Sequence, residues 1–213
     1  MTITVTPDVF KLAQVFTISR GSRTEAKVLT VQVERDGVSG WGECVPYARY
    51  NETLESVTAE INGLPADFTR EELQTLLPAG AARNAVDCAL WDLEAKQAGK
   101  RVWELAGLPE PKPEITAYTL SLDTPEKMQA QAAANAHRPL LKIKLGTPDD
   151  MPRLEAVRAG APEARIIIDA NEGWSAAVYA ELAPHLLRLG VELVEQPLPA
   201  GEDEALIGMD RPL

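Results

Sequence analysis

Several residue types are scarce in this sequence, and each scarcity excludes a class of protein. Only two of 213 residues are cysteines, Cys44 and Cys88, and their spacing matches no metal motif, so we expect two buried, reduced thiols in a cytoplasmic protein. No apolar run approaches the length of a membrane span, and the N-terminus lacks the regions of a signal peptide. Basic residues number 21 against 32 acidic ones, and the net charge of −11 argues against nucleic acid or an anionic membrane as a partner.

The composition that remains, 45% hydrophobic and 25% charged, is that of an ordinary globular chain with one large domain or two small ones. Alternating apolar residues over 27–34 lead to Asp36-Gly37, a strong hairpin signal. The second strand of this hairpin, over 38–44, contains glycines that favour a bend or a close backbone approach. The first half of the chain therefore begins as a β-structure.

Helical spacing follows over 67–77 and 81–97, and Gly99 is placed to end the second of these helices. We assign the tryptophans of this half, Trp41, Trp91 and Trp103, to core packing. A proline-rich stretch at 109–113 marks a boundary. We expect an α+β domain over residues 1–112 and a second domain over 113–213.

The second half contains two lysines one residue apart, Lys142 and Lys144, in the apolar run 140–146. Side chains at positions i and i+2 of a strand point to the same face, so the two ammonium groups project together. One interpretation is an edge strand with solubilising lysines. The other is an active site, in which crowding and burial lower a lysine pKa until the amine acts as a general base.

Acids at the ends of later apolar runs favour the second interpretation. The run 165–169 ends at Asp169, and the run 191–195 ends at Glu195 before a proline. Helical stretches over 149–160 and 174–190 separate these runs, an alternation that predicts βαβ units and a parallel sheet. The interval is 25 residues from Lys144 to Asp169 and 26 from Asp169 to Glu195, so each strand carries one reactive side chain at its carboxyl end.

This set of side chains suggests a specific chemistry. Asp169 and Glu195 are hard oxygen donors of the kind that Mg²⁺ prefers. A Lewis acid that holds a carboxylate substrate, with a lysine beside the α-carbon, can remove the α-proton and stabilise the enediolate that forms. The sequence therefore predicts magnesium-assisted proton abstraction.

The motifs also resemble those of a known group, the enolase superfamily, and within it the muconate-lactonizing-enzyme subgroup. The resemblance extends over nearly the whole chain, and its arginine-rich and G-E-C-x-P-Y stretches are most similar to the dipeptide epimerases. The matching segments are K-x-K at 142–144, D-A-N-E-G-W at 169–174, V-E-Q-P-L at 194–198, and the N-terminal stretches 20–26, 40–47 and 81–93.

The resemblance implies an α+β capping domain followed by an enolase-type (β/α) barrel, and it implies roles for individual residues. Lys144 matches the acid/base catalyst and Lys142 the neighbour that helps lower its pKa, while Asp169 and Glu195 match Mg²⁺ ligands. The substrate would be a dipeptide, with Arg23 or its neighbour Arg20 recognising a glutamate carboxylate. The remaining substrate-side assignments are Tyr47, in a second capping loop, and Asn171, in the D-x-N motif.

The same spacing shows where the chain falls short of such a barrel. Counting back one unit from Lys144 reaches a fitting first strand over 115–122, so the chain holds about four βα units against the eight of a complete barrel. The resemblance places a third metal ligand on the fifth strand and a second catalytic lysine on the sixth, and neither has a counterpart here. We therefore expect an N-terminal fragment of an epimerase.

Two alternatives to a dipeptide epimerase stay open. The first is another reaction of the subgroup, that of muconate cycloisomerase or o-succinylbenzoate synthase. The second is a catalytically inactive folded fragment. Because a half barrel exposes two sheet edges and an apolar interior, the sequence also favours a homo-oligomer, including a domain-swapped one.

Overall fold

The computed structural model describes residues 1–210 and divides them into two compact units. Met1–Leu12 and Glu25–Lys112 form the first unit. Ala13–Thr24 and Pro113–Leu213 form the second, of which 211–213 are not described. The segment 13–24, which the sequence places in the first half, therefore packs with the second half of the chain. A domain boundary between 112 and 113 stays a prediction.

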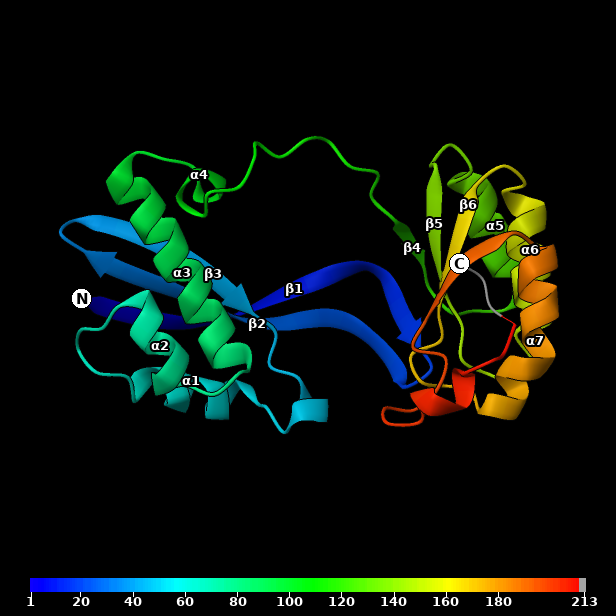
Figure 1. The fold of residues 1–213 in the computed structure, drawn as a ribbon, viewed down its shortest axis with the longest axis horizontal. Coiled ribbons are helices and arrows are strands. Elements are labelled where there is room, and N and C mark those ends of the chain that lie inside the picture. The colour runs from blue at the N-terminus through cyan, green and yellow to red at the C-terminus, as the bar shows by residue number, and fades with distance from the viewer. Residues whose placement is uncertain (211–213) are drawn as a thin grey trace. The chain divides into compact units, whose positions relative to one another are not determined.

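The first unit is built from an antiparallel hairpin, a third strand beside it and a set of helices (Figure 1). Its sheet has the order β1-β2-β3, and β1 and β2 continue into the segment 13–24. The elements are β1 (Thr2–Ile18), β2 (Gly21–Arg35), β3 (Val38–Cys44), the 3₁₀ turn η1 (Ala48–Tyr50), α1 (Leu54–Asn62), α2 (Arg70–Leu76), α3 (Ala81–Ala98) and α4 (Val102–Leu105).

The hairpin β2–β3 forms where the sequence predicts it. Asp36 and Gly37 both have positive φ, and the paired strands begin on either side of them. On the face toward the helices, Gly40 and Gly42 allow α3 to lie directly on β3, because a Cβ at either position would lie 2.1 Å from a carbonyl oxygen of α3. The expected close backbone approach is confirmed.

The helices of this unit begin and end on local signals. Thr53 and Thr69 each form a capping box at the start of α1 and α2, and Gly99 ends α3 in the left-handed conformation that the sequence predicts for it. The helix α1 and the strand β1 have no counterpart among the predicted elements. The core of the unit consists of Leu29, Val31 and Val33 of β2 packed against the apolar faces of α1, α2 and α3.

Two sequence-based assignments in this unit are wrong. Trp41 is 51% exposed, because its neighbours Gly40 and Gly42 face α3 and the alternation of the strand turns Trp41 to the other face. Cys88 is exposed, since it lies on the outer side of α3, whereas Cys44 is buried as expected.

The second unit is a four-stranded parallel sheet with the order β4-β5-β6-β7 and a helix after each of the first three strands. This arrangement confirms the predicted βαβ pattern and the partial (β/α) barrel. The elements are β4 (Tyr118–Leu120), α5 (Pro125–Ala134), β5 (Leu140–Lys144), α6 (Met151–Gly160), β6 (Arg165–Asp169), α7 (Ala176–Arg188), β7 (Val191–Glu195) and the 3₁₀ turn η2 (Asp203–Leu206).

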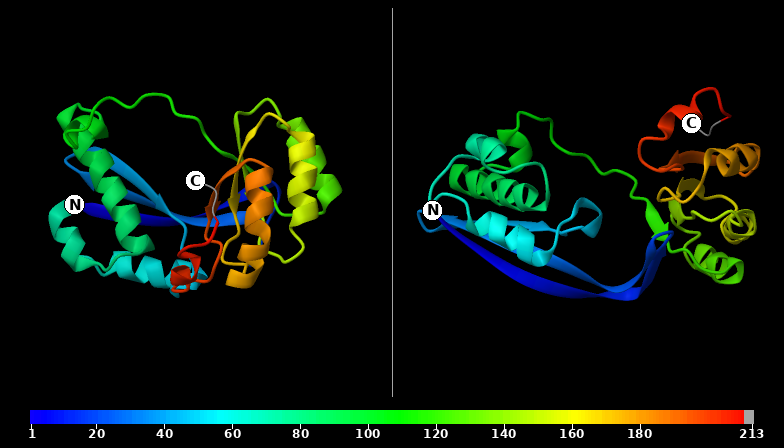
Figure 2. Two further views of the ribbon diagram at one scale, coloured as in Figure 1. Left: turned by 45° about the vertical axis from the view of Figure 1, so that its right-hand side comes forward. Right: turned by 90° about the horizontal axis from the view of Figure 1, so that it is seen from below.

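The helices α5, α6 and α7 cover one face of this sheet (Figures 1 and 2). Alternate strand residues such as Leu141, Ile143, Ile166 and Ile168 point toward them and are fully buried in one apolar core. The residues between them point to the opposite face. That face therefore carries Lys142, Lys144 and Asp169, and the same alternation that builds the core selects the side chains of the site.

Candidate active site

The charged side chains lie at the carboxyl ends of three neighbouring strands. The parallel pairing sets Lys144 of β5 beside Asp169 of β6, and Asp169 beside Glu195 of β7. Because the βα units are almost equal in length, three residues that are 25 and 26 positions apart lie side by side in the sheet. Lys142 precedes Lys144 by two residues in β5, so its side chain points to the same face of the sheet.

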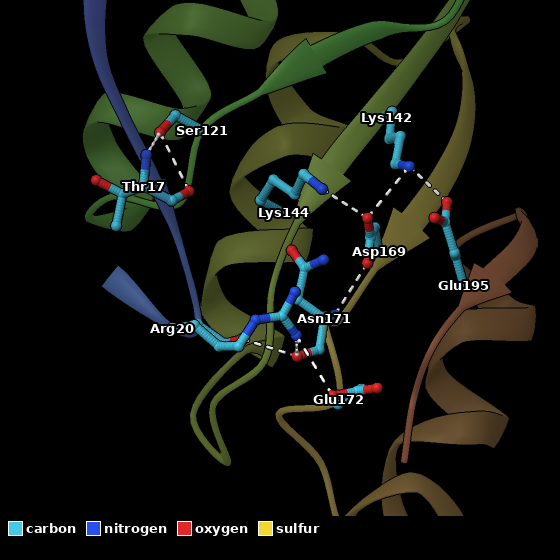
Figure 3. Close-up of polar contacts among 10 residues, drawn as sticks. Thr17, Arg20, Ser121, Lys142, Lys144, Asp169, Asn171, Glu172 and Glu195 are labelled. Atoms are coloured by element: carbon cyan, nitrogen blue, oxygen red, sulfur yellow. Dashed lines mark hydrogen bonds and ion pairs between the residues drawn. The ribbon is translucent and has the colours of Figure 1, made fainter. Parts of the chain in front are cut away.

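The four side chains form one network of ion pairs (Figure 3). One oxygen of Asp169, Oδ2, accepts from Lys144 Nζ at 2.5 Å and lies 3.2 Å from Lys142 Nζ. Lys142 Nζ also donates to Oε2 of Glu195. Asp169 is 2% exposed and Lys144 is 8% exposed, whereas Glu195 remains accessible at its side chain. The network thus reaches from a buried pair to a solvent-accessible carboxylate.

Burial and the facing carboxylates act on Lys142 in opposite directions. Burial alone would lower the pKa of Lys142, but its bonds to Glu195 and Asp169 outweigh burial, and the pKa of Lys142 is raised. Burial likewise acts to raise the pKa of Asp169, and the bond from Lys144 outweighs it, so the pKa of Asp169 is lowered. At both residues the opposite charge nearby, and not burial, decides the direction of the pKa shift. The role predicted for Lys142 beside the catalytic lysine stays a prediction.

Asn171 lies in a tight turn after β6. Its φ is 49°, its backbone N–H donates to Asp169 Oδ1 at 2.9 Å, and its side chain is almost fully buried. Within the part of the chain that the structure describes, the side-chain oxygen Oδ1 of Asn171 has no hydrogen-bond partner. A buried acceptor without a partner is costly, and it belongs to the residue whose backbone N–H bonds the Asp169 carboxylate.

The two candidate arginines have different surroundings. Arg20 donates from Nη1 to the carbonyl of Asn171 at 2.7 Å and lies 3.5 Å from the carboxylate of Glu172. The guanidinium of Arg23 instead lies 5.5 Å from the ring centre of Phe16, the same ring that lies 5.9 Å from Lys144 Nζ. Phe16 was not predicted as a site residue. It belongs to the segment 13–24, and only tertiary packing brings it beside Lys144.

Tyr47 belongs to the first unit, where it lies in the loop after β3 with its ring 5.9 Å from that of Tyr50. Its predicted role on the substrate side stays a prediction.

Asp150 is a further buried carboxylate near the site, and it was not predicted from the sequence. It is 1% exposed, at the start of α6, and Oδ2 accepts from the backbone N–H of Gly146 and of Thr147, each at 2.7 Å, and from the indole of Trp174 at 2.9 Å. Thr147 Oγ1 and Arg153 bind its other oxygen. Asp150 thereby joins the loop after Lys144 to the loop after Asp169, and its local sequence gives no sign of this.

The residues present fit a divalent cation. The ammonium group of Lys142 contacts an oxygen of Asp169 and an oxygen of Glu195, so a single positive group reaches both carboxylates. Carboxylate oxygens are hard donors of the type that Mg²⁺ selects. The unpartnered Oδ1 of Asn171 adds a neutral oxygen nearby. Among residues 1–210, no group of three or more His, Cys, Asp or Glu side chains is arranged to hold a metal.

Comparison with known protein families assigns both halves of the chain. Residues 1–107 match the N-terminal domain of the mandelate racemase and muconate lactonizing enzyme family, and residues 126–210 match the enolase C-terminal domain-like family.

Among characterised relatives, the L-Ala-D/L-Glu epimerase of Escherichia coli is 44% identical over 218 residues, covering all of this chain and 68% of that protein. An N-acetyl-D-glutamate racemase of Pseudoalteromonas is 47% identical over 183 residues, covering 82% of this chain and 57% of that protein. The chain thus spans between about half and two thirds of the length of these relatives.

Solved structures agree. An enolase family member from Agrobacterium tumefaciens, described as homologous to dipeptide epimerases and determined with sodium and L-Ala-L-Glu, superposes with a TM-score of 0.94 at 52% identity, over 99% of this chain and 66% of that one. A dipeptide epimerase from Enterococcus faecalis, in complex with Mg and L-Leu-L-Tyr, superposes with a TM-score of 0.86 at 27% identity, over 96% of this chain and 62% of that one. The chain therefore belongs to the mandelate racemase and muconate lactonizing enzyme family of the enolase superfamily.

Proposed function

We propose that this chain carries the metal-binding and proton-abstracting part of a Mg²⁺-dependent dipeptide epimerase of the L-Ala-D/L-Glu type. One observation carries the proposal: the in-register alignment of Lys144, Asp169 and Glu195 on three adjacent strands, joined by Lys142 into one ion-pair network. Strand-end residues of a (β/α) barrel are the usual source of catalytic groups. The predicted domains, 1–112 as a capping domain and 113–213 as the partial barrel, belong to the same proposal.

In this proposal Lys144 is the general base. Its amine is almost buried beside Asp169 and next to the ring of Phe16, so few water molecules compete for the proton that it accepts at Nζ. Asp169 and Glu195 would hold the Mg²⁺ ion, which supplies Lewis-acid stabilisation of the charge that develops on the substrate carboxylate. Lys142, which contacts both of these carboxylates, keeps their side chains turned toward each other.

The substrate we propose is a dipeptide with a C-terminal glutamate. The named activities of the Escherichia coli and Pseudoalteromonas relatives act at or beside a glutamate, and they differ in whether an amino acid or an acetyl group is attached to it. Arg23 is the arginine we assign to a glutamate carboxylate, because its guanidinium lies on Phe16 beside Lys144. We assign the side-chain amide of Asn171 to the substrate or the metal, because its buried Oδ1 has no hydrogen-bond partner in residues 1–210. Tyr47 keeps its assignment to the substrate side.

Inversion of the α-carbon needs a proton donor on the face opposite the base. We assign no such group among residues 1–210. The activity expected of this chain is therefore exchange of the α-proton with solvent, with little inversion.

The experiment incubates the chain with Mg²⁺ and L-Ala-L-Glu in D₂O and follows the glutamate α-proton by NMR. We expect deuterium to enter in the wild type and not in Lys144→Gln. Lys127→Gln is the matched control, because Lys127 is an exposed lysine of α5 that pairs only with Asp123 in the described contacts. N-acetyl-glutamate serves as a second substrate, to separate the two activities of the relatives.

A wild-type chain that exchanges no α-proton would overturn intrinsic catalysis. That result would instead support the alternative of an inactive folded fragment. Exchange that survives in Lys144→Gln would overturn the assignment of the base.

The assembly and location that we propose follow from the sheet and the thiols. In the described residues β4 and β7 are the outer strands of the parallel sheet, and Leu193 of β7 is exposed. Such an edge favours pairing with a second copy, so we propose a homo-oligomer, with domain swapping as one form of it. Light scattering after gel filtration would test it, and a monomer at high concentration would contradict it.

Cys44 and Cys88 are both free, which supports a reducing, cytoplasmic location. Among the described residues, no helix is long and apolar enough to cross a membrane.

A further inference from the structure

The carbonyl oxygen of Asn171 is held by two side chains from the segment 13–24. Arg20 Nη1 donates to it at 2.7 Å (Figure 3). Ser19 Oγ donates to the same oxygen at 3.1 Å. Arg20 also lies 3.5 Å from the carboxylate of Glu172, the next residue. Two donors on one carbonyl, one of them charged, fix the orientation of that peptide group.

This carbonyl belongs to a turn that L-amino acids adopt at a cost. Asn171 and Glu172 both have left-handed φ, 49° and 65°, although neither is glycine. Space around the turn is also restricted, because a Cβ at Gly173 would lie 2.3 Å from the carbonyl oxygen of Gly146. Contacts from outside the turn must therefore offset its strain, and those with Arg20 and Ser19 are among them.

The same residue reaches the candidate metal ligand through its other backbone group. The N–H of Asn171 donates to Asp169 Oδ1 at 2.9 Å, while Asp169 Oδ2 faces the two lysines. A short path thus runs from Arg20 through the backbone of Asn171 to the carboxylate of Asp169. Rotating this residue out of its left-handed conformation would break the hydrogen bonds at both ends of the path.

The segment that carries Arg20 is itself anchored at the end of β4. The backbone N–H of Thr17 donates to Ser121 Oγ at 2.7 Å, and Leu122 N–H donates to the carbonyl of Thr17 at 3.1 Å. Ser121 is 4% exposed, so this anchor is buried. The segment 13–24 therefore contacts the sheet at two places, beside β4 and beside the turn after β6.

We propose that Arg20 is a positioning residue for Asp169, and that docking of the segment 13–24 is coupled through Asn171 to cation binding at this carboxylate. The coupling rests on the proposed function, in which Asp169 is a metal ligand. Such coupling is reciprocal: if docking orients Asp169 for the cation, the cation must stabilise docking by the same factor. Arg20 is thereby assigned to the protein backbone, and Arg23 is left for the substrate.

The sign of one effect separates this proposal from simple electrostatics. Replacing Arg20 with glutamine removes a positive charge near the cation site, which by charge alone would strengthen cation binding. Loss of positioning weakens it, because residues that orient metal ligands typically contribute about 10- to 100-fold to metal affinity. The proposal therefore predicts weaker binding in a variant whose charge change favours tighter binding.

The first measurement needs no metal. Amide exchange followed by NMR should show a protected Asn171 N–H in the wild type, and exchange at this amide at least about ten-fold faster in Arg20→Gln. Ser19→Ala removes the second donor without a charge change. It should accelerate exchange of the Asn171 N–H by less than Arg20→Gln does. Equal protection of Asn171 in the wild type and in Arg20→Gln would overturn the positioning role.

The second measurement titrates Mn²⁺ alone, as a probe for the divalent site, and records free Mn²⁺ by electron paramagnetic resonance. We expect the affinity for Mn²⁺ to be about ten-fold lower in Arg20→Gln than in the wild type, and partly restored in Arg20→Lys. The control is Arg23→Gln, which makes the same charge change in the same segment and should not lower the affinity for Mn²⁺. In the wild type, Mn²⁺ should also slow exchange of the amides of 13–24.

The outcomes separate the metal assignment from the coupling. If the wild type binds no Mn²⁺, the metal assignment and the coupling that rests on it are both overturned. The hydrogen-exchange rate of the Asn171 N–H in Arg20→Gln would still test the positioning role. Binding that is equal or tighter in Arg20→Gln, with a wild type that binds, would overturn the coupling alone.

Discussion

The indole Nε1 of Trp174 donates a 2.9 Å hydrogen bond to the carboxylate of Asp150, and both side chains are buried, at 2% and 1% exposure. Trp174 follows the strand that ends at Asp169, and Asp150 follows the strand that ends at Lys144. The bond therefore joins the two loops that carry the chain away from the site. Backbone N–H groups of Gly146 and Thr147 also donate to the Asp150 carboxylate.

Removing the Asp150 carboxylate should destabilise the second unit strongly. Asp150→Ala leaves the buried donors of Gly146, Thr147 and Trp174 without an acceptor, and we expect a loss of about 3 kcal/mol in the free energy of unfolding. Urea denaturation followed by tryptophan fluorescence measures it. The matched control is the exposed neighbour, Asp149→Ala, expected within about 0.5 kcal/mol of the wild type. Equal effects at both positions would contradict this role of Asp150.

The close approach of α3 to β3 predicts a second effect on stability. In Gly42→Ala the new methyl group would lie 2.1 Å from the carbonyl oxygen of Ala85, so helix and strand must separate, at a cost of about 2–3 kcal/mol. The control is Gly63→Ala, where the nearest atom is 3.4 Å away and φ is −79°, and which should cost less than about 1 kcal/mol. A shift in the thermal midpoint of the first unit that is no larger for Gly42→Ala than for Gly63→Ala would refute the tight packing.

The Arg158 side chain predicts that arginine cannot be exchanged for lysine at the end of α6. Its guanidinium donates to the carbonyls of Ala164 at 2.7 Å, Leu189 at 3.0 Å and Pro162 at 3.1 Å, whereas a lysine ammonium cannot span them in one plane. Burial lowers the pKa of Arg158, because desolvation disfavours the charged guanidinium. We expect Arg158→Lys to destabilise by about 1–3 kcal/mol in chemical denaturation. The control is Arg188→Lys, because the Arg188 side chain is exposed and its ion pair with Glu155, at 3.7 Å, is long.

The two thiols should differ in reactivity. Burial raises the pKa of Cys44 from 9.0 to about 11, and the Glu52 carboxylate adds to the rise, whereas Cys88 is exposed with a smaller upward shift caused by burial. At about pH 8 only about one Cys44 thiol in a thousand would be ionised. An aromatic disulfide reagent should therefore modify Cys88 readily and Cys44 only after unfolding. Two thiols that react at one rate in the native protein would contradict this.

The same shift gives a pH dependence of stability. In the unfolded chain Cys44 ionises near its ordinary pKa of 9.0, and in the folded chain only near about 11. The stabilisation from keeping the thiol neutral is complete below pH 9.0 and is lost as the pH rises toward about 11, by at most about 2–3 kcal/mol. Comparing urea denaturation of the wild type and Cys44→Ala across this range measures it. The difference between the two proteins should shrink as the pH rises, and a constant difference would refute the linkage.

Local sequence signals predicted much of the fold because they act over a few residues. The Asp36-Gly37 turn, the helix end at Gly99 and the alternation in 140–144 each depend on steric preferences or on burial of one face. The helix α1 was missed, although its capping box at Thr53 and Ser56 gave a signal at its start. Trp41 was assigned to the core on residue type alone, whereas the glycines beside it decide which face of β3 meets α3.

By itself the sequence determined that Lys142, Lys144, Asp169 and Glu195 would meet, because strands of one parallel sheet separated by equal βα units align their carboxyl ends. Only the tertiary structure decided which oxygen each ammonium contacts and that carboxylates raise the pKa of Lys142. It also decided that Arg20 bonds the backbone of Asn171, and that Phe16 and Asp150 belong to the site region. The reason is physical. Alternation and spacing are local and repeat along the chain, whereas a contact between residues 20 and 171 depends on how distant segments pack, which no local pattern records.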